Sequence, residues 1–99
     1  MLKLIVKFEM KEGCREAFFQ KVSEEGILAK VRAEEGCHYY DFYDSKQDPD
    51  LLLLLEEWQD MDAQRAHIAS DHMARFREIK KDYVNNTIIQ AYELAEYDP

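Results

Sequence analysis

The sequence is poor in basic residues and strongly acidic. Of its 99 residues, 13 are Lys or Arg and 21 are Asp or Glu, so the formal charge is −8. Affinity for nucleic acid comes largely from basic side chains on phosphates, so this balance argues against a nucleic-acid ligand. Anionic membrane surfaces are disfavoured for the same reason. The excess of acids serves either solubility, which we favour, or attraction of a cationic partner.

Cysteines are few and no long apolar run is present. Cys14 and Cys37 lie in no close pairing motif, which is typical of a reducing compartment. Residues 1–8 alternate with lysines and do not resemble the apolar core of a signal peptide. The leucine run at residues 51–55 is far too short to span a bilayer. We therefore expect a cytoplasmic protein with no membrane partner.

No internal repeat, low-complexity segment or linker divides the chain, so one domain over residues 1–99 is expected. Periodicity and capping residues predict strands at 2–10, 37–44, 51–58 and 87–97, and helices at 14–34, 60–69 and 72–83. The first helix is expected to be weakened or bent at Gly26 and to be ended by Gly36. This order predicts an α+β fold of the ferredoxin-like, split βαβ type, with an antiparallel four-stranded sheet.

The third predicted strand carries five consecutive leucines. Successive side chains point to opposite faces of a sheet, so Leu52 and Leu54 face one way and the other three leucines face the other. Both faces are therefore apolar, but the predicted helices can cover only one of them. A second copy packing its sheet on the open face would cover the other. The alternative is that the C-terminal segment folds over it.

Three short motifs follow one another along the chain. They are EEGCHYY at 34–40, LEEW at 55–58 and AHIASDHM at 66–73, followed by Phe76. Together they resemble the antibiotic biosynthesis monooxygenase family, and most closely its small quinol monooxygenases. The resemblance implies a homodimeric α/β barrel with a pocket in each subunit between the sheet and the two shorter helices. The family includes cofactor-independent oxygenases of polycyclic phenols, haem-degrading enzymes and an isomerase of a phosphorylated sugar-like signal, so membership does not fix the reaction.

Glu56 and His67 are the first candidates for catalysis. Glu56 lies among leucines on one strand face, where a carboxylate is costly unless it is paired or protonated. His67, on the next helix, matches the first histidine of the family motif. We predict a Glu56–His67 pair in which the carboxylate fixes the imidazole tautomer and the imidazole moves a proton. The structural alternative is that Glu56 caps a backbone group or bonds Trp58, and that His67 is a buried, satisfied histidine.

His72 matches the second family histidine and lies in the first turn of a helix, where a neutral imidazole is expected. It is predicted to bond a substrate oxygen, or else simply to bond the adjacent loop. We predict no metal, because the spacing of five from His67 is unlike a zinc pair and no third ligand is evident. Haem is disfavoured because no histidine occurs in the last helix at 76–80. No cofactor is therefore expected.

Aromatic residues are expected to form the substrate-binding walls. Trp58 shares the strand face of Glu56, and Phe76 lies on the last helix. His38 and Tyr40 are predicted to share a face of the second strand and to line the pocket or the dimer seam.

The leading functional hypothesis is a cofactor-free monooxygenase, acting with O2 on a small electron-rich phenol or quinol. One alternative is a proton-shuttling isomerase of a phosphorylated or carbonyl metabolite, with Lys3, Lys7 or Arg75 as phosphate-binding cations. The other is a homodimer that binds a ligand without catalysis.

Overall fold

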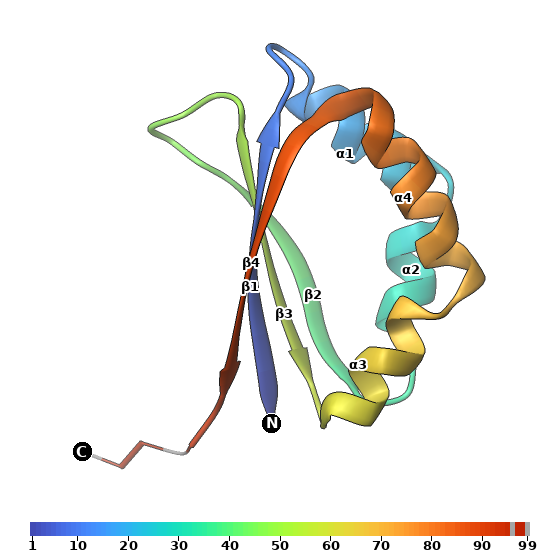
Figure 1. Cartoon of the computed structure of the whole chain (residues 1–99), viewed down its shortest axis with the longest axis vertical. Helices are drawn as coiled ribbons and strands as arrows, with labels where there is room; N and C mark the ends of the chain where they lie inside the picture. Colours follow the sequence, from blue (N-terminus) through green and yellow to red (C-terminus); the bar gives the residue numbers. More distant parts are fainter. Residues whose placement is uncertain (96, 99) are drawn as a thin grey trace.

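A four-stranded antiparallel sheet carries four helices on one of its faces (Figure 1). The computed structural model describes residues 1–95, 97 and 98. In chain order the elements are β1 (Leu2–Met10), α1 (Arg15–Glu24), α2 (Ile27–Arg32), β2 (Cys37–Asp44), β3 (Leu51–Trp58), α3 (Met61–Ile68), α4 (Asp71–Tyr83) and β4 (Val84–Glu93). The strand order is β2-β3-β1-β4. The predicted ferredoxin-like α+β fold is confirmed.

The core lies between the sheet and the helices. Alternate residues of β1 point into it, and Leu52 and Leu54 of β3 are each 1% exposed. Phe8 of β1, Phe18 of α1 and Phe76 of α4 form a triangle with ring centroids 5.7–6.0 Å apart. Since burying one such side chain contributes on the order of 1.5–3 kcal/mol, this layer dominates the stability of the fold.

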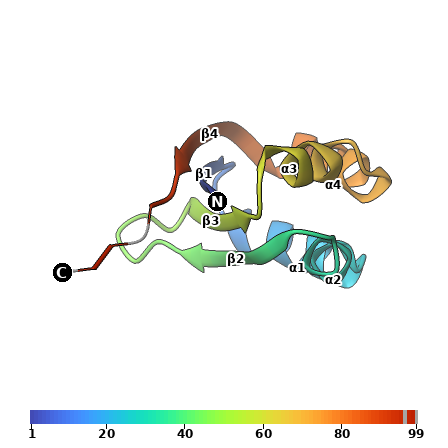
Figure 2. The ribbon, with the colours of Figure 1, turned by 90° about the horizontal axis from the view of Figure 1, so that it is seen from below.

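The other face of the sheet has no helix over it (Figure 2). Its apolar side chains are partly or fully exposed: Ile5, Leu51, Leu53, Leu55, Ile88 and Tyr92. The C-terminal segment leads away from this face (Figure 1), and Tyr97 is 86% exposed. Among the described residues, therefore, the C-terminal segment does not cover the open face.

Two predicted elements have different bounds in the structure. The helix predicted at 14–34 is two helices, because Gly26 adopts the left-handed conformation with φ 74° and ends the first one. The last strand starts at Val84, three residues earlier than predicted, and ends at Glu93. Asn86 belongs to this strand, since it pairs with Glu9 of β1 and donates to the Glu9 carboxylate at 2.7 Å. No helix of the described residues is both long and apolar enough to cross a membrane.

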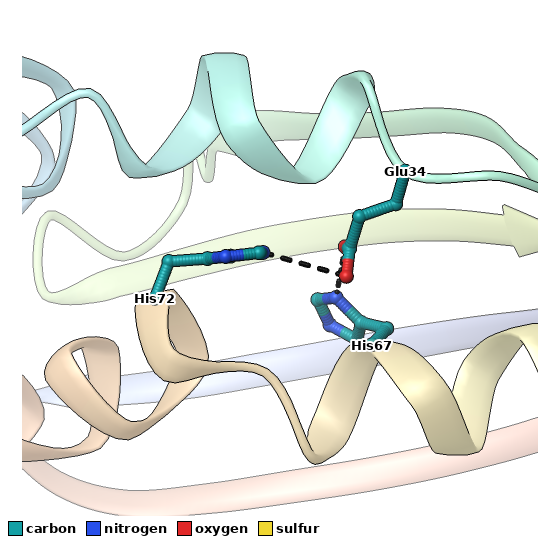
Figure 3. Close-up of side chains that lie close together, drawn as sticks. All are labelled: Glu34, His67 and His72. Carbon is teal, nitrogen blue, oxygen red and sulfur yellow. Dashed lines mark hydrogen bonds and ion pairs between the residues drawn. The ribbon is translucent and has the colours of Figure 1, made fainter.

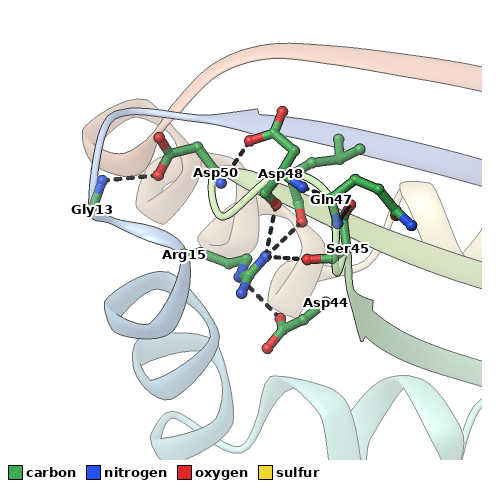
Figure 4. A network of polar contacts seen from close by, with 8 residues as sticks. Gly13, Arg15, Asp44, Ser45, Gln47, Asp48 and Asp50 are labelled. Atoms are coloured by element: carbon green, nitrogen blue, oxygen red, sulfur yellow. Dashed lines mark hydrogen bonds and ion pairs between the residues drawn. The ribbon is translucent and has the colours of Figure 1, made fainter.

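Arg15 fixes the loop that connects β2 and β3 (Figure 4). Its Nη1 donates to the backbone oxygens of Ser45, Asp48 and Leu51 at 3.0–3.2 Å, and its Nε lies 3.2 Å from the Asp44 carboxylate. The loop therefore bonds to the start of α1.

Gly36 forms a close contact between the turn before β2 and the start of α3. Its φ is 82°, so the predicted left-handed conformation is confirmed, but α2 has already ended at Arg32. The Gly36 carbonyl accepts from Gln59 N–H at 2.8 Å. A Cβ at this position would lie 2.7 Å from the Cβ of Ala63. Glycine is therefore required here for backbone conformation and for space.

The substitution Gly36→Ala should destabilise the protein more than Gly13→Ala. Gly13 has φ 72° and open space around it, so alanine there costs only strain, about 1–2 kcal/mol. At Gly36 the contact with Ala63 adds overpacking, which costs a further ~1–3 kcal/mol. Urea denaturation of both variants checks this, and equal losses of stability would show that the contact relaxes without cost.

Candidate functional site

The centre of the candidate site is a hydrogen bond between Glu34 and His67 (Figure 3). Glu34 lies in the turn between α2 and β2, and His67 lies in the last turn of α3. Nδ1 of His67 is 2.7 Å from Oε2 of Glu34, and the His67 side chain is 1% exposed. A carboxylate accepts only, so the network assigns the ring proton to Nδ1 and leaves Nε2 as an acceptor.

His72 approaches the same carboxylate from the first turn of α4 (Figure 3). Its Nε2 lies 3.4 Å from Oε1 of Glu34, close enough for an ion pair. The geometry does not make a hydrogen bond, and Nε2 of His72 is buried without a hydrogen-bond partner among the described residues. Ser70 caps this helix by accepting from Met73 N–H, which holds the histidine in place. Glu34 is thus flanked by two imidazoles.

Two aromatic side chains enclose the His67 ring. The Trp58 ring centroid lies 4.5 Å from that of His67, and Tyr40 meets it edge-on at 5.6 Å. Trp58 and Tyr40 are 0% and 1% exposed. These contacts remove the imidazole from bulk water and fix its plane.

The predicted pair of Glu56 with His67 is wrong. Nε1 of Trp58 donates to Oε1 of Glu56 at 2.9 Å, which was the structural alternative for Glu56, and the carboxylate partner of His67 is Glu34. The prediction correctly placed Glu56 and Trp58 on the core side of β3. It missed Glu34 because the pairing joins residues 33 apart in sequence. The only signal was the EEG motif at 34–36, which we interpreted as a helix end and a family motif.

Burial governs the protonation of both acid–base groups. Desolvation raises the pKa of Glu56 to about 7, opposed by the hydrogen bond from Trp58 and reinforced by the charge of Glu34. Desolvation also lowers the pKa of His67, and the hydrogen bond that His67 donates to Glu34 partly compensates. The lowered pKa of His67 therefore favours a neutral imidazole beside Glu34, and Glu56 can carry a proton near neutral pH.

His67 lines a mostly apolar cavity of about 210 Å³ between the sheet, α3, α4 and β4. Tyr40, Glu56 and Phe76 also line it, together with Arg77 and Lys80 of α4. A cavity of roughly 150 Å³ accommodates benzene, so this space suits a small ring system. Glu34, Trp58 and His72 are not among the residues that line this cavity.

His38 does not share a face with Tyr40, contrary to the prediction. A β-bulge between Cys37 and Tyr39 changes the alternation, and Nδ1 of His38 lies 2.8 Å from Oε2 of Glu57, a residue of the opposite face. Nε2 of His38 lies 3.1 Å from Gln59. The bulge therefore places His38 away from the cavity.

The cations predicted for a phosphorylated substrate are also elsewhere. Arg75 pairs with Glu25 at 2.6 Å on the outer side of the helices. Lys3 and Lys7 alternate with the core residues of β1 and lie on the open face of the sheet. The basic residues at the cavity are Arg77 and Lys80 instead.

The structure supplies the third metal ligand that the sequence did not reveal. One ligand atom each of Glu34, His67 and His72 lie within 4.8 Å of one another. Two imidazoles and a carboxylate are ligands that transition metals accept. In this geometry, however, Nδ1 of His67 and Glu34 share a proton at 2.7 Å, and a metal ion would have to replace it.

The family model named antibiotic biosynthesis monooxygenase matches residues 1–79, and the chain belongs to this family. The chain is similar to the solved structure of PA3566 from Pseudomonas aeruginosa, with 30% identity, a TM-score of 0.82 and coverage of 95% of this chain and 94% of that one. A conserved protein from Methanosarcina mazei Go1 is 26% identical, with a TM-score of 0.82 and coverage of 92% and 89%.

A structure named antibiotic biosynthesis monooxygenase has the same fold, with 24% identity, a TM-score of 0.83 and coverage of 97% and 100%. No curated protein matches the chain.

The substitution Glu56→Gln should change the pH dependence of stability. The pKa of Glu56 is raised from 4.5 to about 7 in the folded state, so the folded chain binds this proton more tightly than the unfolded chain. The contribution of Glu56 to the free energy of unfolding is complete below pH 4.5 and is lost as the pH rises through 7. Glutamine does not titrate but keeps an oxygen for Trp58.

Relative to Glu56→Gln, the wild-type free energy of unfolding should fall by on the order of 3 kcal/mol between about pH 4 and pH 8. Urea denaturation across that range measures it. The exposed Glu35→Gln serves as the control, with no such difference. If the difference in the free energy of unfolding between the wild type and Glu56→Gln does not change with pH, Glu56 is solvated or paired in solution.

Proposed function

We propose that the chain is a cofactor-free monooxygenase that acts on a small electron-rich phenol or quinol. The observation that carries the proposal is the Glu34–His67 hydrogen bond beside the apolar cavity, which presents His67 as a base. Membership of the monooxygenase family supports the reaction class. The cavity walls, which include Tyr40, Phe76 and Leu54, suit a flat ring.

The first step is removal of the phenolic proton. Nε2 of His67 accepts the proton, and the imidazolium that forms is stabilised by Glu34 at Nδ1. Burial of the imidazole keeps it neutral before the step, since its pKa is lowered. His72 acts as a positioning residue in this scheme, because its Nε2 faces Glu34.

The phenolate formed is electron-rich enough to reduce O2 directly. A ring C–H opposite the phenolate oxygen is replaced by a C–O bond, the product is a quinone, and the second oxygen atom leaves as water. The phenolic proton taken up by His67 and the proton of the replaced C–H bond both end in that water, and the substrate supplies all four electrons, so no reductant is consumed. In this scheme Glu56, which lines the cavity and is protonated below about pH 7, would donate a hydrogen bond to a developing peroxide.

The substitution His67→Gln should lower kcat by about 10²–10⁴-fold, the usual contribution of a general base. Oxygen uptake with 1-naphthol and related phenols measures this, and 18O2 labelling of the quinone checks the oxygen transfer. Glu34→Gln should also lower kcat and shift the acid limb of the pH profile downward, because Glu34 raises the pKa of His67.

The neighbouring Glu35→Gln is the matched control and should leave both kcat and the pH profile unchanged. Activity should persist after treatment with a chelator, in contrast to an enzyme that uses a metal at Glu34, His67 and His72. Turnover at full rate without oxygen would overturn the oxygenase and favour the isomerase. Unchanged turnover by His67→Gln would remove the base from the mechanism.

We also propose that the protein is a cytoplasmic homodimer. The open face of the sheet supports a second copy, since Leu51, Leu53 and Leu55 of β3 stay partly exposed there, whereas Leu52 and Leu54 on the helix side of the same strand are each 1% exposed. The two sheets would pack face to face about a twofold axis. A reducing compartment is supported by the two free cysteines, Cys14 and Cys37.

The substitution Leu53→Asp should convert the dimer into monomers, because it places a charge at the centre of the open face opposite Lys7 of β1. Sedimentation velocity at micromolar concentration measures the change. Lys46→Asp, in the exposed β2–β3 loop, is the control and should stay dimeric. A wild-type chain that sediments as a monomer would contradict the proposed dimer.

A further inference from the structure

Two cations stand beside the cavity without an acidic partner. Arg77 and Lys80 are one turn apart on α4, and both line the cavity that holds His67. Neither lies within ion-pair distance of a carboxylate among the residues described.

Other basic residues of the same helix are neutralised. Arg75 makes two hydrogen bonds to Glu25 at 2.6 and 2.7 Å, and Lys81 bonds Glu78 at 3.3 Å. Both of these residues face away from the cavity. The helix therefore pairs its outer cations and leaves its cavity-facing cations without a counter-charge.

Lys80 is held over an apolar surface. Its Nζ lies 5.7 Å from the ring centroid of Phe8, a core residue that also lines the cavity. Burial lowers the pKa of Lys80, and the charge of Arg77 lowers it further, with no carboxylate raising it. A cation in this environment gains from any anion that approaches it, since the surrounding medium screens charge weakly.

Arg77 is fixed but not saturated. One of its guanidinium nitrogens, Nη1, donates to the backbone oxygen of Ile68 at the end of α3, at 3.2 Å. The remaining N–H donors have no partner among the described residues. Arginine presents a planar set of donors that matches a carboxylate, and the bond to Ile68 orients that set beside the cavity.

The polar groups of the cavity therefore fall into two sets. His67 of α3 and Glu56 of β3 provide two separate acid–base groups, and Arg77 and Lys80 of α4 provide positive charge. The apolar side chains of Val6, Phe8 and Phe76 also line the cavity. A ring that places its hydroxyl at His67 would therefore lie in the same cavity as both cations, which are available to a second substituent.

We propose that the substrate is an aromatic hydroxy acid, whose carboxylate is bound by Arg77 and Lys80 while its phenolic hydroxyl lies at His67. This inference rests on the proposed function for the hydroxyl end, but the carboxylate end stands on the two cations alone. It specifies a substrate class, an anionic phenol, in place of neutral phenols or quinols.

Isothermal titration calorimetry with a matched pair of ligands tests the proposal. We use 6-hydroxy-2-naphthoate and its methyl ester, which differ by one charge and share the hydroxylated ring system. The wild-type protein should bind the acid about tenfold or more tightly than the ester, with the preference falling as salt is raised. Competition between the two ligands shows that they share a site.

The variant Arg77→Gln/Lys80→Gln should lose the preference for the acid while its affinity for the ester stays within about twofold. Lys81→Gln, one residue further along α4 and turned away from the cavity, is the control and should keep the full preference. Equal binding of acid and ester by the wild type would overturn the proposal, as would a preference that survives in the double variant.

The two proposals fail in different ways. If the chain binds the acid selectively but consumes no oxygen with any phenol, the oxygenase is wrong and the anion site stands. If it oxidises neutral naphthols and binds the acid no better than the ester, the anion site is wrong and the oxygenase stands.

Discussion

The site depends on a hydrogen bond that His67 donates to Glu34, between two segments 33 residues apart. It joins the turn before β2 to the end of α3, where the Gly36 backbone also approaches α3 without a side chain. The bond also determines the chemistry. A buried imidazole alone would be a neutral, undirected group, whereas the carboxylate fixes its tautomer and orients its free nitrogen.

The fold could be predicted from sequence because its signals are local and periodic. Alternation in β1, the leucine run of β3 and the caps Asp60 and Ser70 each specified their own element, and the structure confirms all four. The errors concern features that periodicity does not report. Gly26 ends a helix through a single left-handed residue, and the β-bulge at Cys37–Tyr39 reverses the side on which His38 lies.

The site was less predictable than the fold, since its contacts depend on tertiary packing. Strand alternation placed Glu56 on the correct face of the sheet. His67 was predicted as its partner, but the indole N–H of Trp58, two residues away, donates to the Glu56 carboxylate instead. Glu34 stood in a turn, where a carboxylate is usually solvated. Only the packing of α3 against that turn makes it part of a buried pair.

The junction between α4 and β4 has a mechanical consequence. The helix ends at Tyr83 and the strand begins at Val84, with no connecting loop to absorb movement. At the helix end, Lys11 N–H also bonds the Tyr83 carbonyl. The last turns of α4, and with them Lys80, therefore behave as a rigid extension of the outermost strand. Any tilt of that strand would be transmitted to the charged wall of the cavity.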